Sequence, residues 1–322
     1  MPALAYEQAL EEAMVEEMRA DERVFYMATI TAQRLLEEFG PDRVRTTPIA
    51  ESAMTGMAIG AAGSGFRPIV GWGNVCFSFV AFDQIANQAA KIRYMFGAQR
   101  DFPIVFRAGY LNGTRSAAQH SQTGYALYAH AGGLKIAVPS RAADAKGLMK
   151  TAIQDDNPVV FLTPQRLLPV VGEVPNDEVA VPFGRGVVLR EGSDVTIVGI
   201  GTMAVVALEA AERLAAQGVS AEVIDPRTLV PLDIDLIRSS VQRTHRLVVV
   251  DESFPTCSFA SEIASLVVED GDSFGALEAP VRRVCTAPVP IPFSPVLEDF
   301  VVPGVDRVVA EALATTDGRT GV

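Results

Sequence analysis

The chain has 322 residues, of which 27 are Lys or Arg and 39 are Asp or Glu, so its formal net charge is −12 at pH 7. This length exceeds one ordinary domain and suits two, each able to bury its own core. The negative charge argues against nucleic acid or an anionic membrane as a partner. An uncharged run of fifteen residues between Arg67 and Asp83 is too short to cross a bilayer.

The cysteines and the first residues bear on the cellular compartment. Cys76, Cys257 and Cys285 are far apart and lack the paired spacing of a zinc site or a disulfide framework. Residues 1–12 carry acids where a signal peptide would have bases followed by an apolar core. These features predict free thiols and a cytoplasmic protein.

Helical patterns alternate with short strand-like runs in the first half of the chain. Leu10, Met14 and Met18 mark one face of an amphipathic first helix. Pro48 excludes a helix arriving from upstream, so a new helix is expected to begin near Glu51. The other predicted elements are strands over 68–70, 104–107, 135–138 and 159–162, and helices over 82–96 and 142–155. Such alternation predicts a parallel sheet covered by helices on both faces.

A linker and a second alternating unit follow. Periodicity fails over 163–183, where prolines stand at 164, 169, 175 and 182. Beyond this segment, strands are predicted over 195–198, 221–224, 247–250 and 281–284, and helices over 203–217, 234–241 and 258–269. We therefore predict a first domain of residues 1–183, including the linker, and a second domain of residues 184–322.

Glu51 is a single carboxylate at the start of an otherwise uncharged predicted helix. Small residues recur at 53, 56, 60 and 63 on one helix face, where another backbone can approach closely. Ile49, Met54 and Met57 are expected to remove water from Glu51. A desolvated carboxyl group is better suited to proton transfer near neutral pH. The alternative is an exposed glutamate that the helix dipole stabilises.

Several segments occur in an order that resembles a known family. They include RPIV at 67–70, FDQIANQAAKIRYM at 82–95, PIVFR at 103–107, AAQHSQ at 117–122, DAKG at 144–147 and DDNPV at 155–159, and they continue through 191–198, 222–225, 227–228, 246–252 and 260–263. Together they resemble the beta subunit of the thiamine-diphosphate-dependent decarboxylase component of 2-oxo acid dehydrogenase complexes. This group includes the pyruvate, branched-chain and acetoin enzymes. The resemblance implies a transketolase-like α/β fold of two doubly wound domains, a pyrimidine-binding domain and a transketolase C-terminal domain.

The resemblance also implies an activity. It suggests an oxidoreductase that cleaves its substrate and transfers the acyl group to the lipoamide of an acyltransferase, active only with an alpha subunit. Segments 93–97, 251–258 and 286–295 favour the acetoin dehydrogenase subgroup. Pyruvate and branched-chain 2-oxo acid dehydrogenases remain alternatives, as does a split transketolase-type enzyme.

Site residues follow from the same resemblance. In this family a buried glutamate hydrogen-bonds to the aminopyrimidine of the cofactor and promotes loss of the thiazolium proton; the matching residue is Glu51. Phe77 falls where the family stacks an aromatic ring on the pyrimidine, and Ile49 is expected to touch the same ring. His120 matches a histidine near the thiazolium, to which proton handling or support of acyl transfer is assigned. A core phenylalanine and a structural histidine are the alternatives, and His130 and His245 are expected to be structural or surface residues.

A potassium site is a further implication. In some relatives a helix end binds potassium through carbonyl groups and one asparagine side chain, and the matching residues are Ile104, Ala152, Ile153, Asp155 and Asn157. Carbonyl groups left unpaired at a helix C-terminus are natural ligands for a cation. The alternative is an ordinary helix end before Pro158, which needs no ion.

Two further patterns concern cofactors. GIGTMA at 199–204, with Asp225 ending the next predicted strand, matches a dinucleotide fingerprint and supports an alternative of another class, an NAD-binding Rossmann module. The Gly-Asp-Gly and paired-asparagine signature that binds magnesium diphosphate in thiamine enzymes does not occur; residues 271–273 read Gly-Asp-Ser. The resemblance therefore implies an alpha subunit that holds the diphosphate and magnesium in an alpha2beta2 enzyme, and a lipoyl acyltransferase core as a further partner.

The sequence departs from the family pattern near Glu51. MATIT at 27–31 stands where relatives usually show Gly-Glu-Asp, Thr46 replaces a common aspartate, and GWGNVC at 71–76 replaces an acidic residue and a more regular run. Because these segments approach Glu51 and Phe77, we expect them to bear on pocket shape and substrate choice.

Overall fold

The computed structural model describes residues 3–175 and 180–316. Residues 1–2 of the first predicted domain, residues 176–179 of the predicted linker and residues 317–322 of the second predicted domain lie outside the described part. The chain forms two compact units. The first contains Met1–Leu111 and Gln122–Phe183, and the second contains Asn112–Ser121 and Gly184–Val322. A short loop of the first half of the sequence thus belongs, by its contacts, to the second unit.

A parallel sheet forms the centre of the first unit. Its strands are β2 (Val24–Ala28), β3 (Val44–Thr46), β4 (Arg67–Asn74), β5 (Val105–Tyr110), β6 (Lys135–Ala137) and β7 (Val159–Pro164). They lie in the order β6-β7-β5-β4-β2-β3, every neighbouring pair parallel. The four predicted strands are confirmed, whereas β2 and β3 were not predicted. Strand β7 is buried along its whole length, as expected for a strand covered on both faces.

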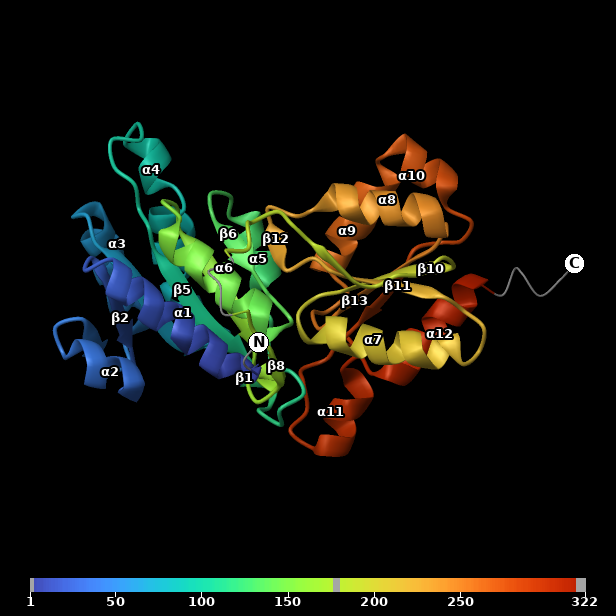
Figure 1. Ribbon diagram of the computed structural model, residues 1–322, viewed down its shortest axis with the longest axis horizontal. Helices are drawn as coiled ribbons and strands as arrows, with labels where there is room; N and C mark the ends of the chain where they lie inside the picture. The colour runs from blue at the N-terminus through green and yellow to red at the C-terminus, as the bar shows by residue number, and fades with distance from the viewer. Residues whose placement is uncertain (1–2, 176–179, 317–322) are drawn as a thin grey trace, which may run out of the picture. The chain divides into compact units, whose positions relative to one another are not determined.

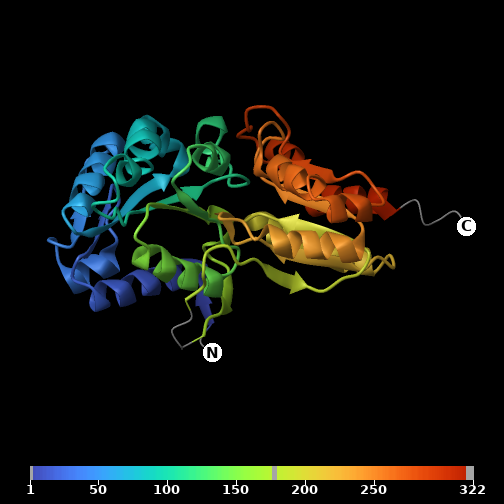
Figure 2. The ribbon, with the colours of Figure 1, turned by 90° about the horizontal axis from the view of Figure 1, so that it is seen from above.

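Helices cover both faces of this sheet (Figure 2). They include α1 (Tyr6–Ala20), α2 (Gln33–Phe39), α3 (Glu51–Gly63), α5 (Tyr125–His130) and α6 (Ala142–Gln154). Leu10, Met14 and Met18 of α1 are buried, which confirms the predicted amphipathic helix. The predicted start near Glu51 is confirmed by α3.

The predicted helix over 82–96 is wrong in its form. The segment follows 3-10 helix η1 (Val75–Ala81) and contains π-helix η2 (Gln84–Ala89) and the short helix α4 (Ile92–Met95). In the π-turn the Ala90 amide donates to the Ile85 carbonyl at 3.0 Å, five residues back. Packing decides this break: a Cβ on Gly133 would lie 2.1 Å from the Ala90 carbonyl oxygen, and the Lys91 ammonium donates to the Gly132 carbonyl at 2.9 Å.

The predicted linker over 163–183 is wrong for its first part. Strand β7 continues to Pro164, and η4 (Gln165–Leu167) follows it. Strand β8 (Val171–Glu173) pairs antiparallel with β1 (Ala3–Ala5). A three-residue strand with one partner is too short to give a readable pattern of alternation.

The second unit is a second, smaller sheet with helices on both sides. Its strands β9 (Val187–Arg190), β10 (Val195–Gly199), β11 (Ala221–Asp225), β13 (Leu247–Asp251) and β14 (Arg282–Cys285) lie in the order β14-β13-β10-β11-β9. Only β9, at the edge, is antiparallel to its neighbour. Figure 1 shows α8 (Ile234–Thr244) and α9 (Phe259–Val268) on one side of the strands, and α7 (Thr202–Ala215) and α12 (Val305–Thr316) on the other.

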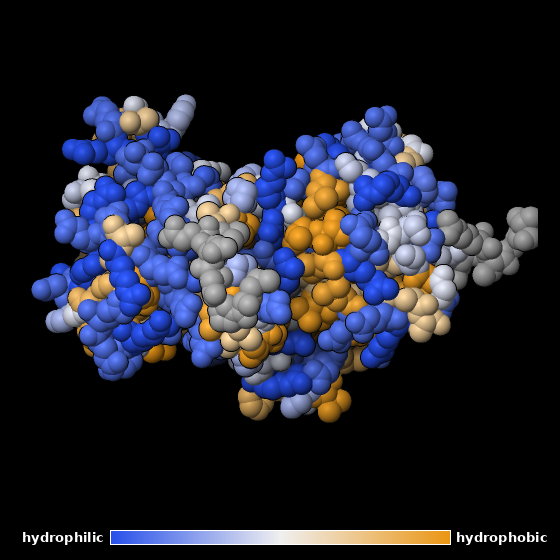
Figure 3. Space-filling view, in the orientation of Figure 1, coloured by the Kyte–Doolittle hydropathy of each residue, from blue (hydrophilic) through white to orange (hydrophobic). Residues whose placement is uncertain are grey.

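The predicted elements of the second unit are confirmed in type and order. Strands β9 and β12 (Thr228–Val230) and helices α10 (Gly271–Ala276), α11 (Pro295–Val301) and α12 were not predicted. The core between α7, α12 and the sheet is aliphatic and contains Ile197, Leu214, Val223 and Val248. Much of the visible surface is hydrophilic, with an apolar area over the second unit (Figure 3).

The state of the cysteines and the length of the apolar helices can be compared with the sequence predictions. Cys76, Cys257 and Cys285 are free thiols, and burial raises the pKa of Cys285 to about 11, which keeps it protonated near neutral pH. Between residues 3 and 316, apart from 176–179, no helix has both the length and the apolar composition of a bilayer-spanning segment.

Candidate functional site

The central sheet fixes the first turn of α3, where Glu51 lies. The Thr55 hydroxyl donates to the Glu51 carbonyl at 2.7 Å, and the indole Nε1 of Trp72 donates to the Thr55 hydroxyl at 3.2 Å. The Trp72 ring stacks on Phe106, with 4.9 Å between ring centroids. Strands β4 and β5 thus anchor the helix turn that carries the carboxylate.

Glu51 is buried, at 7% exposure, but not for the predicted reason. Met54 is fully buried, whereas Ile49 is 84% and Met57 54% exposed. The prediction that Ile49 and Met57 shield Glu51 within this chain is therefore wrong. The helix start packs against η1 instead, where the Ser52 hydroxyl donates to the Val80 carbonyl at 2.7 Å.

Phe77 lies on η1 and is 39% exposed. The Asn74 side chain caps this 3-10 helix by accepting a hydrogen bond from the Cys76 amide at 2.9 Å. At Gly71, a Cβ would lie 2.6 Å from the Tyr26 hydroxyl, so a larger residue would force that ring to move. The unusual segment 71–76 thus sets the position of η1 and provides Trp72, the anchor of α3.

One face of α3 is open in this chain. Ala53, Gly56 and Gly60 are exposed, and a Cβ on either glycine would meet nothing within 4 Å. The small side chains predicted to admit another backbone therefore have no such neighbour among the residues that the structure describes.

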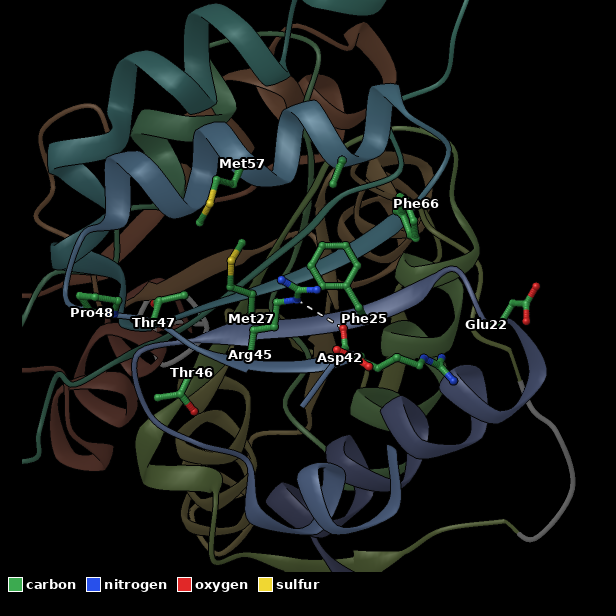
Figure 4. A pocket seen from close by; sticks show the side chains of 12 residues that line it. Glu22, Phe25, Met27, Asp42, Arg45, Thr46, Thr47, Pro48, Met57 and Phe66 are labelled. Carbon is green, nitrogen blue, oxygen red and sulfur yellow. Dashed lines mark hydrogen bonds between the residues drawn. The ribbon is translucent and has the colours of Figure 1, made fainter. Parts of the chain in front are cut away.

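A cavity of about 460 Å³ lies beside α3 on its β2 and β3 side (Figure 4). Met57 of α3 faces Met27 of β2 across it, and Thr46, Thr47 and Pro48, which precede Glu51 in the sequence, also line it. The remaining lining residues are Glu22, Phe25, Asp42, Arg43, Arg45, Ala61 and Phe66. Glu51, Ile49 and Phe77 do not line it, so this cavity adjoins the predicted pyrimidine site without being that site.

Two of the sequence departures meet at Thr46, one of the residues that line this cavity. The Thr31 and Thr46 hydroxyl groups lie 2.6 Å apart in a hydrogen bond. Met27, from the same departing segment, forms part of the cavity wall. Segment 27–31 and Thr46, where the family pattern has acids, thus supply a neutral hydroxyl pair and a thioether.

His120 belongs to the second unit, whereas Glu51, Ile49 and Phe77 belong to the first. It ends the 3-10 helix η3 (Ala118–His120) and is partly buried. Its Nδ1 lies 3.2 Å from the Ser116 carbonyl oxygen. Because a carbonyl oxygen can only accept, Nδ1 is the donor in this contact.

The other two histidines occupy helix ends. His245 is the left-handed C-cap of α8, and its Nδ1 lies 3.0 Å from the Ala276 carbonyl oxygen. His130 is the exposed last residue of α5. These places agree with the structural and surface roles expected for them.

Arg67 donates hydrogen bonds to two carbonyl groups of the predicted potassium site. Its guanidinium donates to the Ile153 carbonyl at 2.8 Å through Nε and to the Asp155 carbonyl at 2.8 Å. The Ile104 carbonyl accepts from the Val159 amide at 2.8 Å. The Asn157 amide group donates to the Asp155 carboxylate at 3.0 Å. The carbonyl groups of Ile104, Ile153 and Asp155 thus already accept hydrogen bonds.

The dinucleotide-like motif has a packing role. A Cβ on Gly199 would lie 2.4 Å from the Met203 carbonyl oxygen, so this glycine allows α7 to sit against β10. Asp225 is fully buried and accepts from the Arg227 amide at 2.7 Å. An acid that binds a ribose must reach the ligand, and this one does not reach the surface.

Family models match both halves of the chain. Residues 2–171 match the pyrimidine-binding domain of transketolase, and residues 184–308 match the C-terminal domain of transketolase. A split-gene transketolase, solved as an inactive beta4 tetramer, superposes with a TM-score of 0.80 at 26% identity, covering 97% of this chain and 98% of that one. The predicted transketolase-like α/β fold is thereby confirmed.

Curated relatives define the family more closely. The beta subunit of acetoin:2,6-dichlorophenolindophenol oxidoreductase is 44% identical in Bacillus subtilis, over 94% of this chain and 87% of the relative, and 48% identical in Cupriavidus necator, over 86% and 81%. A rice mitochondrial pyruvate dehydrogenase E1 beta subunit is 45% identical, over 95% of this chain and 84% of the relative. With this identity along nearly its whole length, the chain belongs to the family of beta subunits of the thiamine-dependent E1 component of 2-oxo acid and acetoin dehydrogenases.

Proposed function

We propose that this chain supplies the pyrimidine half of a thiamine diphosphate site, with Glu51 as the proton-transferring residue. The observation that carries the proposal is a buried carboxylate at the start of α3, beside an element that presents a partly exposed aromatic ring, Phe77. An acid and a flat apolar surface are the two groups that an aminopyrimidine needs for orientation. The residues present therefore fit this end of the cofactor.

Each residue has a separate role. Glu51 holds or accepts a proton at a pyrimidine nitrogen, Phe77 stacks on the ring, and the exposed Ile49 side chain covers its edge. When bound, the cofactor supplies the carbon that attacks the substrate carbonyl. The chain's own contribution is to orient the ring and to keep water away from the Glu51 carboxylate.

An alpha subunit would complete the site in an alpha2beta2 enzyme. The open small-residue face of α3, with Gly56 and Gly60 unobstructed, can accept a closely packed backbone. The diphosphate and its magnesium would bind to the alpha subunit, because the sequence has no signature for them. A lipoyl acyltransferase is the proposed acceptor of the acyl group, and the cytoplasm is the proposed compartment.

His120 would act in the second half of the reaction. Its protonated Nδ1 is turned to the Ser116 carbonyl, which directs Nε2 toward proton exchange. We assign it to support of acyl transfer to lipoamide.

Potassium remains a proposal for the helix end formed by Ile104, Ala152, Ile153, Asp155 and Asn157. A carbonyl oxygen can accept from Arg67 and still bind a cation through its second lone pair. A higher melting temperature in potassium chloride than in sodium chloride at equal ionic strength would support the ion.

Acetoin is the substrate that we favour. Two of the most similar relatives carry acetoin in their names, and the hydroxyl pair Thr31–Thr46 gives the approach a neutral character. A neutral diketone-type or hydroxyketone substrate does not need the charged partner that a 2-oxo acid carboxylate requires. Pyruvate and branched-chain 2-oxo acids are the competing substrates.

The test is reconstitution with the alpha subunit that copurifies with this chain. We expect thiamine-diphosphate-dependent reduction of dichlorophenolindophenol, fastest with acetoin. Preference for pyruvate would overturn the substrate, and equal activity without added alpha subunit would overturn the split site. By calorimetry the beta chain alone should bind the cofactor weakly, and tight magnesium-dependent binding would show that the diphosphate site was misplaced.

A further inference from the structure

The loop between β5 and α5 is held by residues far along the chain. Asn112–Ser121 belong to the same compact unit as Gly184–Val322, although the elements on both sides of the loop belong to the other unit. Asn112 begins the loop, and its side-chain amide donates to the Glu252 carbonyl at 3.0 Å. The conformation of the loop therefore depends on the second unit.

Glu298 of α11 makes the central contact with this loop. Its fully buried side chain accepts from the Gly113 amide at 2.9 Å, from the Arg115 amide at 2.8 Å and from the Arg115 guanidinium at 2.9 Å. Three donors, one of them charged, satisfy a buried carboxylate and hold it in one geometry. Helix α11 is anchored in turn, since Val301 packs in an apolar cluster and its carbonyl accepts from the Ala287 amide at 2.9 Å.

The carboxylate acts where the loop backbone is least favourable. Gly113, Arg115 and Ala117 have φ of +76°, +64° and +63°, the left-handed region that side chains other than glycine rarely adopt. Such conformations persist when the surrounding structure enforces them. Two of the donors to Glu298 are the amides of Gly113 and Arg115, so the carboxylate fixes two of these three positions directly.

His120 follows these positions in the sequence, five residues beyond Arg115 and three beyond Ala117. Ser116, which directly follows Arg115, offers its carbonyl to His120 Nδ1 at 3.2 Å, and the His120 amide donates to the Ala117 carbonyl at 3.2 Å. We infer that Glu298 is a positioning residue: through Arg115 and the Ser116 carbonyl it holds His120 in the orientation used for acyl transfer. This inference rests on the role proposed above for His120.

Glu298→Gln is the sharpest test, because it keeps the volume and removes one acceptor. The carboxylate receives donors on both oxygens, whereas an amide would turn an NH2 group toward one set of donors. Asp299→Asn is the matched control: Asp299 is the next residue and also pairs with Arg115, but it is 65% exposed. Both variants are assembled with the alpha subunit before measurement.

Hydrogen exchange of the loop tests the tether without any substrate. In Glu298→Gln we expect amide exchange over residues 113–121 to accelerate about tenfold or more, because the loop opens more often. Asp299→Asn should stay within about twofold of the parent enzyme, since exposed ion pairs contribute little. Unchanged exchange in Glu298→Gln would overturn the tether, whatever reaction the enzyme catalyses.

Activity tests the consequence for His120. Glu298→Gln should lower lipoyl-dependent kcat by about tenfold, the lower part of the range for general acid-base groups, and shift the pH profile of that step. Dichlorophenolindophenol reduction should fall less, and Glu298→Asp should recover part of the loss. Faster exchange with normal lipoyl-dependent kcat would overturn the positioning role. If His120→Ala also turned over normally, the role assigned to His120 would be wrong. The hydrogen-exchange result would still show whether Glu298 holds the loop.

Arg115→Ala is the second variant if Glu298→Gln does not fold. It removes the guanidinium but keeps both backbone donors to Glu298. We expect the same faster loop exchange and lower lipoyl-dependent kcat, but smaller in size. The absence of these changes would count against the inference.

Discussion

Glu51 and His120 are held in place by two different kinds of structure. Glu51 begins a helix whose first turn is tied to the adjacent central strands through Thr55 and Trp72. His120 lies in a loop with left-handed residues, held by a carboxylate 183 residues away from Arg115 in the sequence. The first position is part of a sheet scaffold, and the second depends on contacts with residues far along the chain, with Glu298 at their centre.

The comparison indicates how each residue should respond to mutation. A residue on a sheet scaffold is displaced only when the core that supports it is altered. Substitutions in that core should therefore lower stability and activity together. A tethered loop can lose its geometry while the rest of the fold keeps its stability. Variants of the two regions should therefore separate these two measurements.

The largest effect is expected for Glu51→Gln. The amide keeps the shape but cannot transfer the proton, so turnover should fall by more than about a hundredfold with an unchanged melting temperature. Glu7→Gln, in the exposed first turn of α1, is the control for a purely helix-dipole role. Near-normal turnover of Glu51→Gln would remove Glu51 from the mechanism.

His120→Ala should show a smaller and selective loss. We expect lipoyl-dependent turnover to fall by about ten- to a hundredfold, while reduction of dichlorophenolindophenol falls less. His130→Ala, at the exposed end of α5, is the matched control and should be neutral. Equal losses in the two assays would contradict a role in acyl transfer.

Thr55→Val tests the support beneath Glu51. It leaves the buried Trp72 indole N–H without its acceptor, which should lower the free energy of unfolding by about 1–3 kcal/mol and reduce turnover as well. Thr55→Ser keeps the hydroxyl and should restore most of the free energy of unfolding, measured by denaturant titration, and most of the turnover. A fully stable Thr55→Val enzyme would show that the anchor does not matter.

The smallest effect is expected at Asp155, near the predicted potassium site. Burial alone would raise the pKa of Asp155, but hydrogen bonds from Lys135 and Asn157 lower that pKa below its ordinary 3.8. A lowered pKa gives stability that is present above the unfolded-state value and lost as the pH falls through the folded-state value. Asp155→Asn should therefore cost about 1.5 kcal/mol near pH 7 and progressively less below pH 3.8. A cost that is independent of pH would contradict this pairing.

Local pattern determined most of the fold. Four strands and three helices of the second unit, and the four strands predicted in the first, could be predicted because each has its own periodicity or end signals, as with Pro48 before α3. Strand β8 and the π-helical turn could not, because a three-residue strand has no period and the turn depends on Gly133, more than forty residues beyond it.

The candidate site divides in the same way. From the sequence, Glu51 was predicted at a helix start and His120 was identified by its family motif. Both predictions rest on residue type and spacing, which the sequence contains. Only the tertiary structure showed that Glu51 is buried although Ile49 and Met57 are exposed. It also showed that Arg67 donates to the proposed ion ligands and that Glu298 holds the loop of His120. These facts depend on contacts between residues far apart in the chain, and such contacts leave no local periodicity from which to predict them.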